Sequence, residues 1–172
     1  MTLGITFPDV SLAEYDQAWV DAFKAERDRL QEILNDRIVG IEHVGSTAIP
    51  GICAKPIIDI AVAVNNLHLA DVFSPDMVRI GYDDAGDGGV PGQRIFGRGP
   101  RIRTHLVHVV VAGSQDWKNY LSFRDTLARD SELAAEYDLL KRSLAARFPH
   151  DRRSYTREKS KFVEQVLSRA AA

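Results

Sequence analysis

The sequence contains a single cysteine, Cys53, among its 172 residues. This excludes a framework of internal disulfide bonds and favours a reducing compartment. No run of about 18 apolar residues is present, so an ordinary membrane-spanning helix is excluded. The opening segment, "MTLGITFPDV", lacks the cationic and apolar parts of a secretion signal. We therefore expect a cytoplasmic protein that does not enter a membrane.

A strong excess of one charge is also missing, because 22 Lys and Arg residues face 24 Asp and Glu residues and the net charge is −2. No global field favours nucleic acid, which is therefore not an expected partner. The sequence has no internal repeat, no low-complexity linker and no pattern that indicates an oligomeric state. Its length and its hydrophobic content of 45% suit one domain over residues 1–172.

The elements that are present follow the order helix, strands, helices. Apolar residues at helical spacing predict a first helix at 11–34, with Ser11 and Glu14 as a capping box. Three helices fill the last third, the first capped by Ser114 and the last by Thr156. Between them we predict strands at 38–44, 57–64, about 78–83 and 104–111, a short helix near 66–74, and a glycine-rich loop with a brief strand at 84–101. This order predicts an α+β fold, a mixed β-sheet flanked by helices.

One acid, Asp59, interrupts the apolar strand "IIDIAVAV" at 57–64. Alternate residues of a strand share a face, so the core face is formed by Ile58, Ile60, Val62 and Val64. Asp59 shares the other face with Ile57, Ala61 and Ala63, and the small alanine side chains leave room for a ligand. A carboxylate buried without a partner costs several kcal/mol. Asp59 therefore has either a fixed partner, such as Lys55, or a ligand-filled cavity before it.

The pair Gly45-Ser46 ends the preceding strand, and by itself it is an ordinary strand terminator. Together with Asp59 it resembles the phosphate-binding turn and metal-binding strand of polymerase-beta-type nucleotidyltransferases. That resemblance implies a nucleoside triphosphate substrate and a divalent metal, Mg²⁺ or Mn²⁺. The chain departs from the pattern at the second metal-binding acid, where it has Ala61. One carboxylate holds Mg²⁺ weakly, which leaves transfer of a nucleotidyl or phosphoryl group and non-catalytic binding both open.

A longer resemblance covers nearly the whole chain from about residue 11. Gly-Ser-Thr, Pro-Gly and Lys-Pro-Ile-Ile-Asp follow in order within "EHVGSTAIPGICAKPIIDIAVAV", and "THLVHVVVAGSQDWKNYLSFRDTL" and "YTREKSKFVEQVL" come later. These motifs resemble the GrpB family of the nucleotidyltransferase superfamily, whose domains are fused to dephospho-CoA kinase in some bacteria. The resemblance implies the superfamily's fold and a small phosphate-containing ligand. It leaves open a nucleotidyltransferase, a nucleotide- or metabolite-binding module and a chaperone-like module.

These patterns give a set of candidate site residues. Asp59 is the expected catalytic and metal-binding acid. His108 is the expected second metal ligand, because His105 and His108 point to opposite faces of a regular strand. The family often has a His-x-His pair here, and this chain has Leu106 at the first position. The expected phosphate-binding residues are Gly45, Ser46, Thr47, Lys55, Arg94, Arg103 and Lys159.

We expect one pocket between the Gly45-Ser46 turn, Asp59 and the glycine-rich segment 84–101. Lys159 is expected to bind phosphate together with the free N–H groups of a helix that starts at Thr156. For Arg94 and Arg103 the alternative to an anion clamp is a surface position. Arg124 either reaches the site or pairs with a nearby acid such as Asp125.

Overall fold

The computed structural model describes residues 3–6 and 8–170, so positions 1–2, 7 and 171–172 of the predicted domain lie outside the described part. Its helices are α1 (Ala18–Leu34), α2 (His68–Arg79), α3 (Gln115–Arg129), α4 (Ser131–Arg147) and α5 (Arg152–Ala170). Its strands are β1 (Ile5–Thr6), β2 (Gly40–Val44), β3 (Ile58–Val64), β4 (Tyr82–Asp84), β5 (Gln93–Arg98), β6 (Ile102–Arg103) and β7 (His105–Val111). Short 3-10 turns, η1 (Asn35–Arg37) and η2 (Ser46–Ala48), follow α1 and β2.

Five strands form one mixed sheet with the spatial order β2-β3-β7-β5-β4. Strand β3 is antiparallel to β2 and parallel to β7, whereas β5 is antiparallel to both β7 and β4. The parallel pair places Asp59 beside Leu106, and Ala61 beside His108. Strands β1 and β6 form a separate antiparallel pair. A mixed sheet with a helical last third confirms the predicted α+β class.

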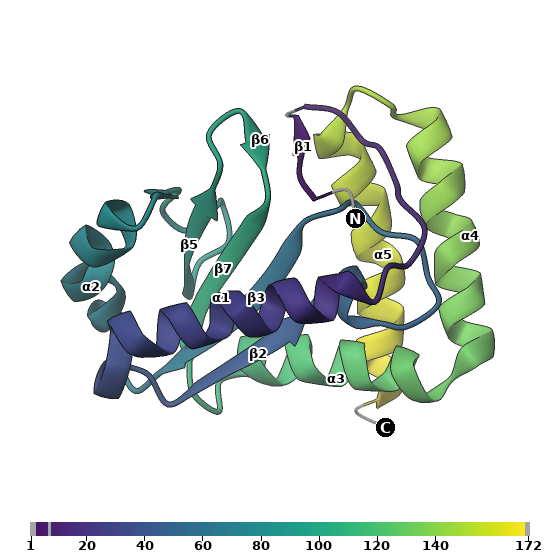
Figure 1. Cartoon of the computed structure of the whole chain (residues 1–172). Helices are drawn as coiled ribbons and strands as arrows, with labels where there is room; N and C mark the ends of the chain where they lie inside the picture. Colours follow the sequence, from purple (N-terminus) through teal and green to yellow (C-terminus); the bar gives the residue numbers. More distant parts are fainter. Residues whose placement is uncertain (1–2, 7, 171–172) are drawn as a thin grey trace.

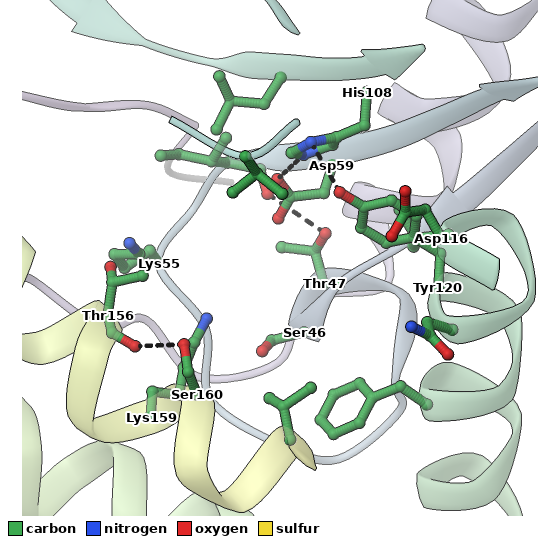
Figure 2. A pocket seen from close by; sticks show the side chains of 18 of the residues that line it. Ser46, Thr47, Lys55, Asp59, His108, Asp116, Tyr120, Thr156, Lys159 and Ser160 are labelled. Atoms are coloured by element: carbon green, nitrogen blue, oxygen red, sulfur yellow. Dashed lines mark hydrogen bonds and ion pairs between the residues drawn. The ribbon is translucent and has the colours of Figure 1, made fainter. Parts of the chain in front are cut away.

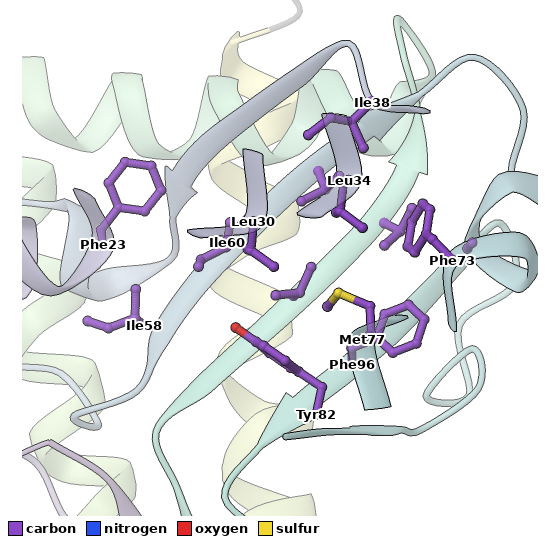
Figure 3. Packing of buried hydrophobic residues seen from close by; sticks show 14 of the residues in the cluster. Phe23, Leu30, Leu34, Ile38, Ile58, Ile60, Phe73, Met77, Tyr82 and Phe96 are labelled. Carbon is purple, nitrogen blue, oxygen red and sulfur yellow. The ribbon is translucent and has the colours of Figure 1, made fainter. Parts of the chain in front are cut away.

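One face of the sheet carries the main hydrophobic core, as the alternation in β3 predicts. Figure 3 shows this core, in which α1 and α2 contribute large apolar side chains opposite the sheet. Burying one such side chain stabilises the fold by about 1.5–3 kcal/mol. A shift of one residue in the pairing register of β3 would turn all of its core side chains to the opposite face. The core therefore fixes the register of β3. Its members include Phe23, Leu30, Leu34, Ile58, Ile60, Val62, Val64, Phe73, Met77 and Phe96.

The opposite face of β3 is small, and the expected room for a ligand exists only at the Asp59 end. Farther along the strand, Ala61 and Ala63 are buried beneath α3. The ring of Trp117 on α3 lies so close that a methyl group added at Gly40 would be 3.4 Å from it and 3.7 Å from Ala63. These small residues therefore let the helix approach the sheet.

Helices α3, α4 and α5 pack against one another at one end of the sheet (Figure 1). Their shared core also includes Ile49 and Ile52, which belong to the loop after η2, so the helices fix this loop as well. None of the helices in the described part of the chain is long and apolar enough to cross a membrane. The members of this second core are Ile49, Ile52, Phe123, Leu127, Ala134, Tyr137, Phe162 and Val166.

The predicted start of the first helix is wrong, because α1 begins at Ala18 and residues 11–17 lie outside it. Ala13 instead forms an antiparallel bridge with Ala54, with N–O distances of 2.8 and 2.9 Å. The expected capping box with Ser11 does not form, and the carboxylate of Glu14 pairs with Arg142 at 2.7 Å. Long-range pairing of this segment therefore overrides its local helix signal.

The predicted start of the last helix is also wrong. Helix α5 begins at Arg152, and the carboxylate of Asp151 accepts the backbone N–H of Ser154 at 3.0 Å. Thr156 consequently lies inside the helix and offers no free N–H groups for an anion. The glycine-rich segment 84–101 contains the full strand β5 rather than a brief one, because it pairs with β7 along its whole length.

Candidate functional site

A cavity of about 510 Å³ opens where the small face of β3 meets the C-terminal helices (Figure 2). Its walls come from the η2 turn, the Asp59 end of β3, β7, α3 and α5. From the segment 84–101 only Val90 and Gln93 line it. The expected pocket around Asp59 and the turn is therefore present, with a smaller share from the glycine-rich segment and a larger share from the helices.

The turn before the cavity requires glycine at position 45. Gly45 has φ +70° and ψ −172°, a backbone conformation that is essentially restricted to glycine. A methyl group added there would lie 2.6 Å from Oδ2 of Asp59. The absence of a side chain at Gly45 therefore lets the backbone of the turn lie directly against the carboxylate.

Asp59 belongs to a chain of hydrogen bonds that crosses from β3 to α3. Its Oδ1 lies 3.2 Å from Nε2 of His108, and Nδ1 of His108 lies 3.1 Å from the hydroxyl of Tyr120. The Tyr120 hydroxyl donates to Oε1 of Gln93 at 3.0 Å. Nε2 of Gln93 donates to the carbonyl of Asp87 at 3.3 Å, which fixes the orientation of the amide.

His108 connects the acid on β3 to helix α3. One ring nitrogen contacts the Asp59 carboxylate, and the other contacts the Tyr120 hydroxyl. Because the Tyr120 hydroxyl is itself bonded to Gln93, the imidazole is held in a fixed orientation toward Asp59.

The electrostatic environment keeps Asp59 ionised. Burial raises the pKa of its carboxyl, but the hydrogen bond from His108 and the charges of His108, Lys159 and Lys55 outweigh burial, so the pKa lies below its usual value. Lys55 forms no ion pair with Asp59, because no contact within 4.0 Å joins the two charged groups in the described structure. The partner of Asp59 is thus a histidine of the neighbouring strand, and the Lys55 alternative is wrong.

Three cationic side chains line the cavity near Asp59: Lys55, Arg152 and Lys159. The Nζ atoms of Lys55 and Lys159 lie 5.1 and 5.9 Å from the ring centroid of Tyr155. Burial lowers the pKa of Lys55 far below its usual range, and the charges of Lys159 and Arg152 lower it further. Mutual repulsion of this kind is relieved when an anion lies among the cations.

Beneath the turn, His43 and Thr47 are buried and bonded to each other. The Thr47 hydroxyl donates to the carbonyl of Ile57 at 3.3 Å, so it accepts from Nε2 of His43 at 3.0 Å. The imidazole of His43 also stacks on Phe23, with 4.7 Å between ring centroids. The hydroxyl of Thr47 is therefore engaged in holding the turn, although the residue lines the cavity as expected.

We expect His43 to make the fold sensitive to acid. Burial is the main cause that lowers its pKa to about 4 from the usual histidine value of 6.5. Between these values the unfolded chain binds a proton that the folded state excludes, so stability falls as the pH drops from about 6.5 to about 4. The loss attributable to His43 is up to about 3 kcal/mol. Urea unfolding of the wild type and His43→Gln at several pH values measures it.

The exposed His68 on α2 provides the control, because its side chain is 77% exposed. His68→Gln should leave the pH dependence of unfolding unchanged. If His43→Gln and the wild type lose the same stability between pH 6.5 and pH 4, the assigned role of His43 is contradicted.

Several predicted residues lie outside the cavity. Arg94 pairs with Asp84 at 2.6 Å and with Asp71 at 3.2 Å, and Arg103 pairs with Asp83 at 2.6 Å. Neither arginine lines the cavity, so the surface alternative describes them both.

Arg124 also has structural partners. It pairs with Glu42 at 2.7 Å and with Asp125 at 2.8 Å, and it donates to the carbonyl of His43 at 2.9 Å. Arg124 does not line the cavity, so of the two alternatives the structure has the ion pair with a nearby acid.

The residues present fit one metal ion incompletely and do not fit a two-metal centre. No group of three or more His, Cys, Asp and Glu side chains gathers to hold a metal ion among residues 3–6 and 8–170. Ala61, at the position of the second acid, is fully buried and does not line the cavity. Asp59 and His108 are the two side chains that remain for an ion, whose other ligands would have to be phosphate oxygens and water.

Sequence reasoning missed Tyr120, Arg152, Gln93 and Asp116, which all line the cavity. The sequence could have indicated Tyr120, because Tyr120 and Phe123 are three residues apart and therefore share one face of α3. The other three had no signal, because only the packing of α3, α5 and β5 around β3 brings them together.

Comparison with known proteins places the chain in a family. The family model described as GrpB protein matches residues 9–169. "Glutamate-rich protein GrpB" of Alkalihalophilus pseudofirmus is 34% identical over 96% of this chain and 98% of its own length. "UPF0157 protein YqkA" of Bacillus subtilis is 35% identical over 94% of this chain, which spans about half, 47%, of that relative. The crystal structure of "conserved protein GrpB" from Enterococcus faecalis superimposes with a TM-score of 0.86 at 33% identity, covering 94% of this chain and 100% of that one. The chain therefore belongs to the GrpB family.

Proposed function

We propose that the cavity binds a nucleotide or another small phosphate-containing metabolite. The observation that carries the proposal is the pair of lysines in the cavity, Lys55 and Lys159. Neither Nζ atom has a hydrogen-bonding or ion-pairing partner within the described structure, and both approach only the ring of Tyr155. Ammonium groups gathered without counterions at a cavity favour an anion, and phosphate forms charge-assisted hydrogen bonds with them.

The turn at Gly45 supplies the second half of the proposed phosphate site. Ser46 lines the cavity, and its hydroxyl has no hydrogen bond within the described residues. Figure 2 shows this hydroxyl directed into the cavity on the side of Lys159. Small residues in a tight turn let phosphate oxygens approach the backbone closely.

Transfer of a nucleotidyl or phosphoryl group is the more specific candidate, and the ionised Asp59 favours it. A divalent ion held by Asp59 and His108 would neutralise charge on the phosphates of the substrate. The short ligand set and the buried Ala61 favour a module that binds without turnover, and a chaperone-like module is the remaining alternative.

A thermal-shift experiment separates these functions. We expect ATP, GTP or pyrophosphate to raise the melting temperature, because a ligand that binds only the folded state stabilises it by mass action. An enzyme also releases product in Mg²⁺ or Mn²⁺, whereas a binding module saturates without product. If no phosphate compound shifts the melting temperature with or without metal, the proposal is contradicted.

Lys159→Ala is expected to weaken phosphate binding by about tenfold or more, which corresponds to 1.4 kcal/mol. The melting temperature should stay nearly unchanged, since Lys159 has no ion pair in the described structure. Titration calorimetry with pyrophosphate measures the affinity.

Lys161→Ala is the matched control, because Lys161 lies on the same helix, pairs with Glu158 at 2.6 Å and does not line the cavity. It should leave the affinity unaltered. If the Lys159→Ala and Lys161→Ala proteins bind pyrophosphate with equal affinity, Lys159 does not contact the phosphate.

A further inference from the structure

Three properties of Lys55 set it apart from an ordinary surface lysine. It is partly buried in the wall of the cavity, its Nζ stands over the ring of Tyr155, and no described side chain pairs with it. Two other cations, Lys159 and Arg152, line the same cavity. Figure 2 shows Lys55 on the cavity wall beside α5, on the side of Thr156 and Lys159.

The backbone around Lys55 is held from outside by the N-terminal segment. The residue before it, Ala54, forms the two-bond bridge with Ala13. The residue after it, Pro56, accepts the backbone N–H of Gly4 at 2.7 Å. Both neighbours are buried. The backbone of Lys55 is therefore fixed on both sides, in the wall of the cavity.

Helix α4 holds the same segment from the other direction. The carboxylate of Asp138 accepts the backbone N–H of Cys53, and the buried ammonium of Lys141 donates to the Cys53 carbonyl. A surface lysine escapes an unfavourable environment by swinging its ammonium group into water. These contacts anchor the backbone from Cys53 to Pro56, so Lys55 leaves the wall of the cavity from a fixed position, and its Nζ stands over Tyr155.

The environment of Lys55 favours its neutral form. Burial is the main cause that lowers the pKa of its amine, and the neighbouring cations Lys159 and Arg152 act in the same direction, while Asp59 opposes them. A lysine that is desolvated and placed near other cations is an activated nucleophile, because only the neutral amine has a free electron pair.

We propose that Lys55 is a nucleophilic amine that forms an imine with a phosphorylated aldehyde or ketone bound in this cavity. The inference rests on the proposed phosphate site, in which Lys159 and Arg152 hold the phosphate. The electron pair of the Lys55 nitrogen forms the new bond to the carbonyl carbon. The carbonyl oxygen leaves as water with the two hydrogens of the amine, so the step needs neither an oxidant nor a reductant.

Reductive trapping tests the inference. The full chain is incubated with pyridoxal 5′-phosphate, which carries both an aldehyde and a phosphate, and the imine is fixed with borohydride. Peptide mass spectrometry should find the adduct on Lys55 at concentrations that leave the exposed Lys24 and Lys118 unlabelled. Pyridoxal without the phosphate should label Lys55 at least about tenfold less, the effect of losing about 1.4 kcal/mol of binding. Pyrophosphate should protect Lys55 from labelling.

Lys55→Arg replaces the amine with a guanidinium group that cannot form the imine, and it should abolish the adduct while pyrophosphate still raises the melting temperature. If Lys55 of the wild type stays unlabelled although pyrophosphate stabilises the protein, the inference is overturned and the proposed function stands. If pyrophosphate neither stabilises the protein nor protects it, and pyridoxal labels as well as its phosphate, the proposed function fails too. Mapping the adduct in the wild type decides the question even if the variant does not fold.

Discussion

Replacing Gly45 with alanine is expected to lower the free energy of unfolding by about 3 kcal/mol or more, the sum of backbone strain and a steric clash. The new methyl group would lie 2.6 Å from Oδ2 and 3.0 Å from Cβ of Asp59. Asp59 cannot retreat easily, because β3 lies inside the sheet between β2 and β7. Either the turn or the carboxylate must move, and both belong to the cavity. Urea unfolding measures the loss, and calorimetry with pyrophosphate should show weaker binding.

Gly51→Ala is the matched control for this prediction. Gly51 also has a positive φ, +80°, but a methyl group added there would meet nothing within 4 Å. Its substitution therefore adds the backbone penalty alone, about 1–2 kcal/mol. Equal losses at Gly45 and Gly51 would mean that the close approach to Asp59 contributes nothing to stability.

Replacing Asp59 with asparagine is expected to strengthen nucleotide binding in the absence of metal and to weaken it in the presence of Mg²⁺, relative to the wild type. If Asp59 holds a divalent ion as proposed, the ion would neutralise charge on the phosphate, so nucleotide affinity of the wild type should rise when Mg²⁺ is added. Without metal the ionised carboxylate repels the phosphate. Asp59→Asn should therefore bind nucleotide more tightly than the wild type in EDTA. In Mg²⁺ it should bind about tenfold more weakly, a difference of 1.4 kcal/mol. If the two proteins respond equally to Mg²⁺, Asp59 is not a metal ligand.

The same variant reports on stability. The surroundings lower the pKa of Asp59, so they favour its charged form. We therefore expect Asp59→Asn to lower the free energy of unfolding by about 1–2 kcal/mol, because its hydrogen bond with His108 is weakened. Asp76→Asn is the control, because Asp76 pairs with Arg37 at 2.8 Å away from the cavity. A loss above about 3 kcal/mol at Asp59 with unchanged ligand binding would identify a purely structural ion pair.

The periodicity of apolar residues was enough to predict the sheet around the site. The alternation in "IIDIAVAV" predicts which face of β3 enters the core, because a strand turns alternate side chains to opposite sides. The same rule separates His105, which is buried with the core face of β7, from His108, which meets Asp59. These features depend on residues close together in the sequence, and local geometry alone decides them.

Tertiary packing decided what surrounds the acid. Pairing between Ala13 and Ala54 replaced a predicted helical turn with an extended segment, because backbone groups of that segment found partners far away in the sequence. Arg94 and Arg103 pair with carboxylates of β4, whereas Lys55 and Lys159 line the cavity that contains Asp59.

The sequence by itself determined the strand that carries Asp59, the face on which the acid lies and the turn that meets it. Only the tertiary structure decided that His108 and Tyr120 complete its hydrogen bonds and that α5 brings cations to the same cavity. The physical reason is the range of the interactions. Side-chain direction along a strand is a local property, whereas the partner of a buried charge is whichever side chain the packing of distant elements places within reach.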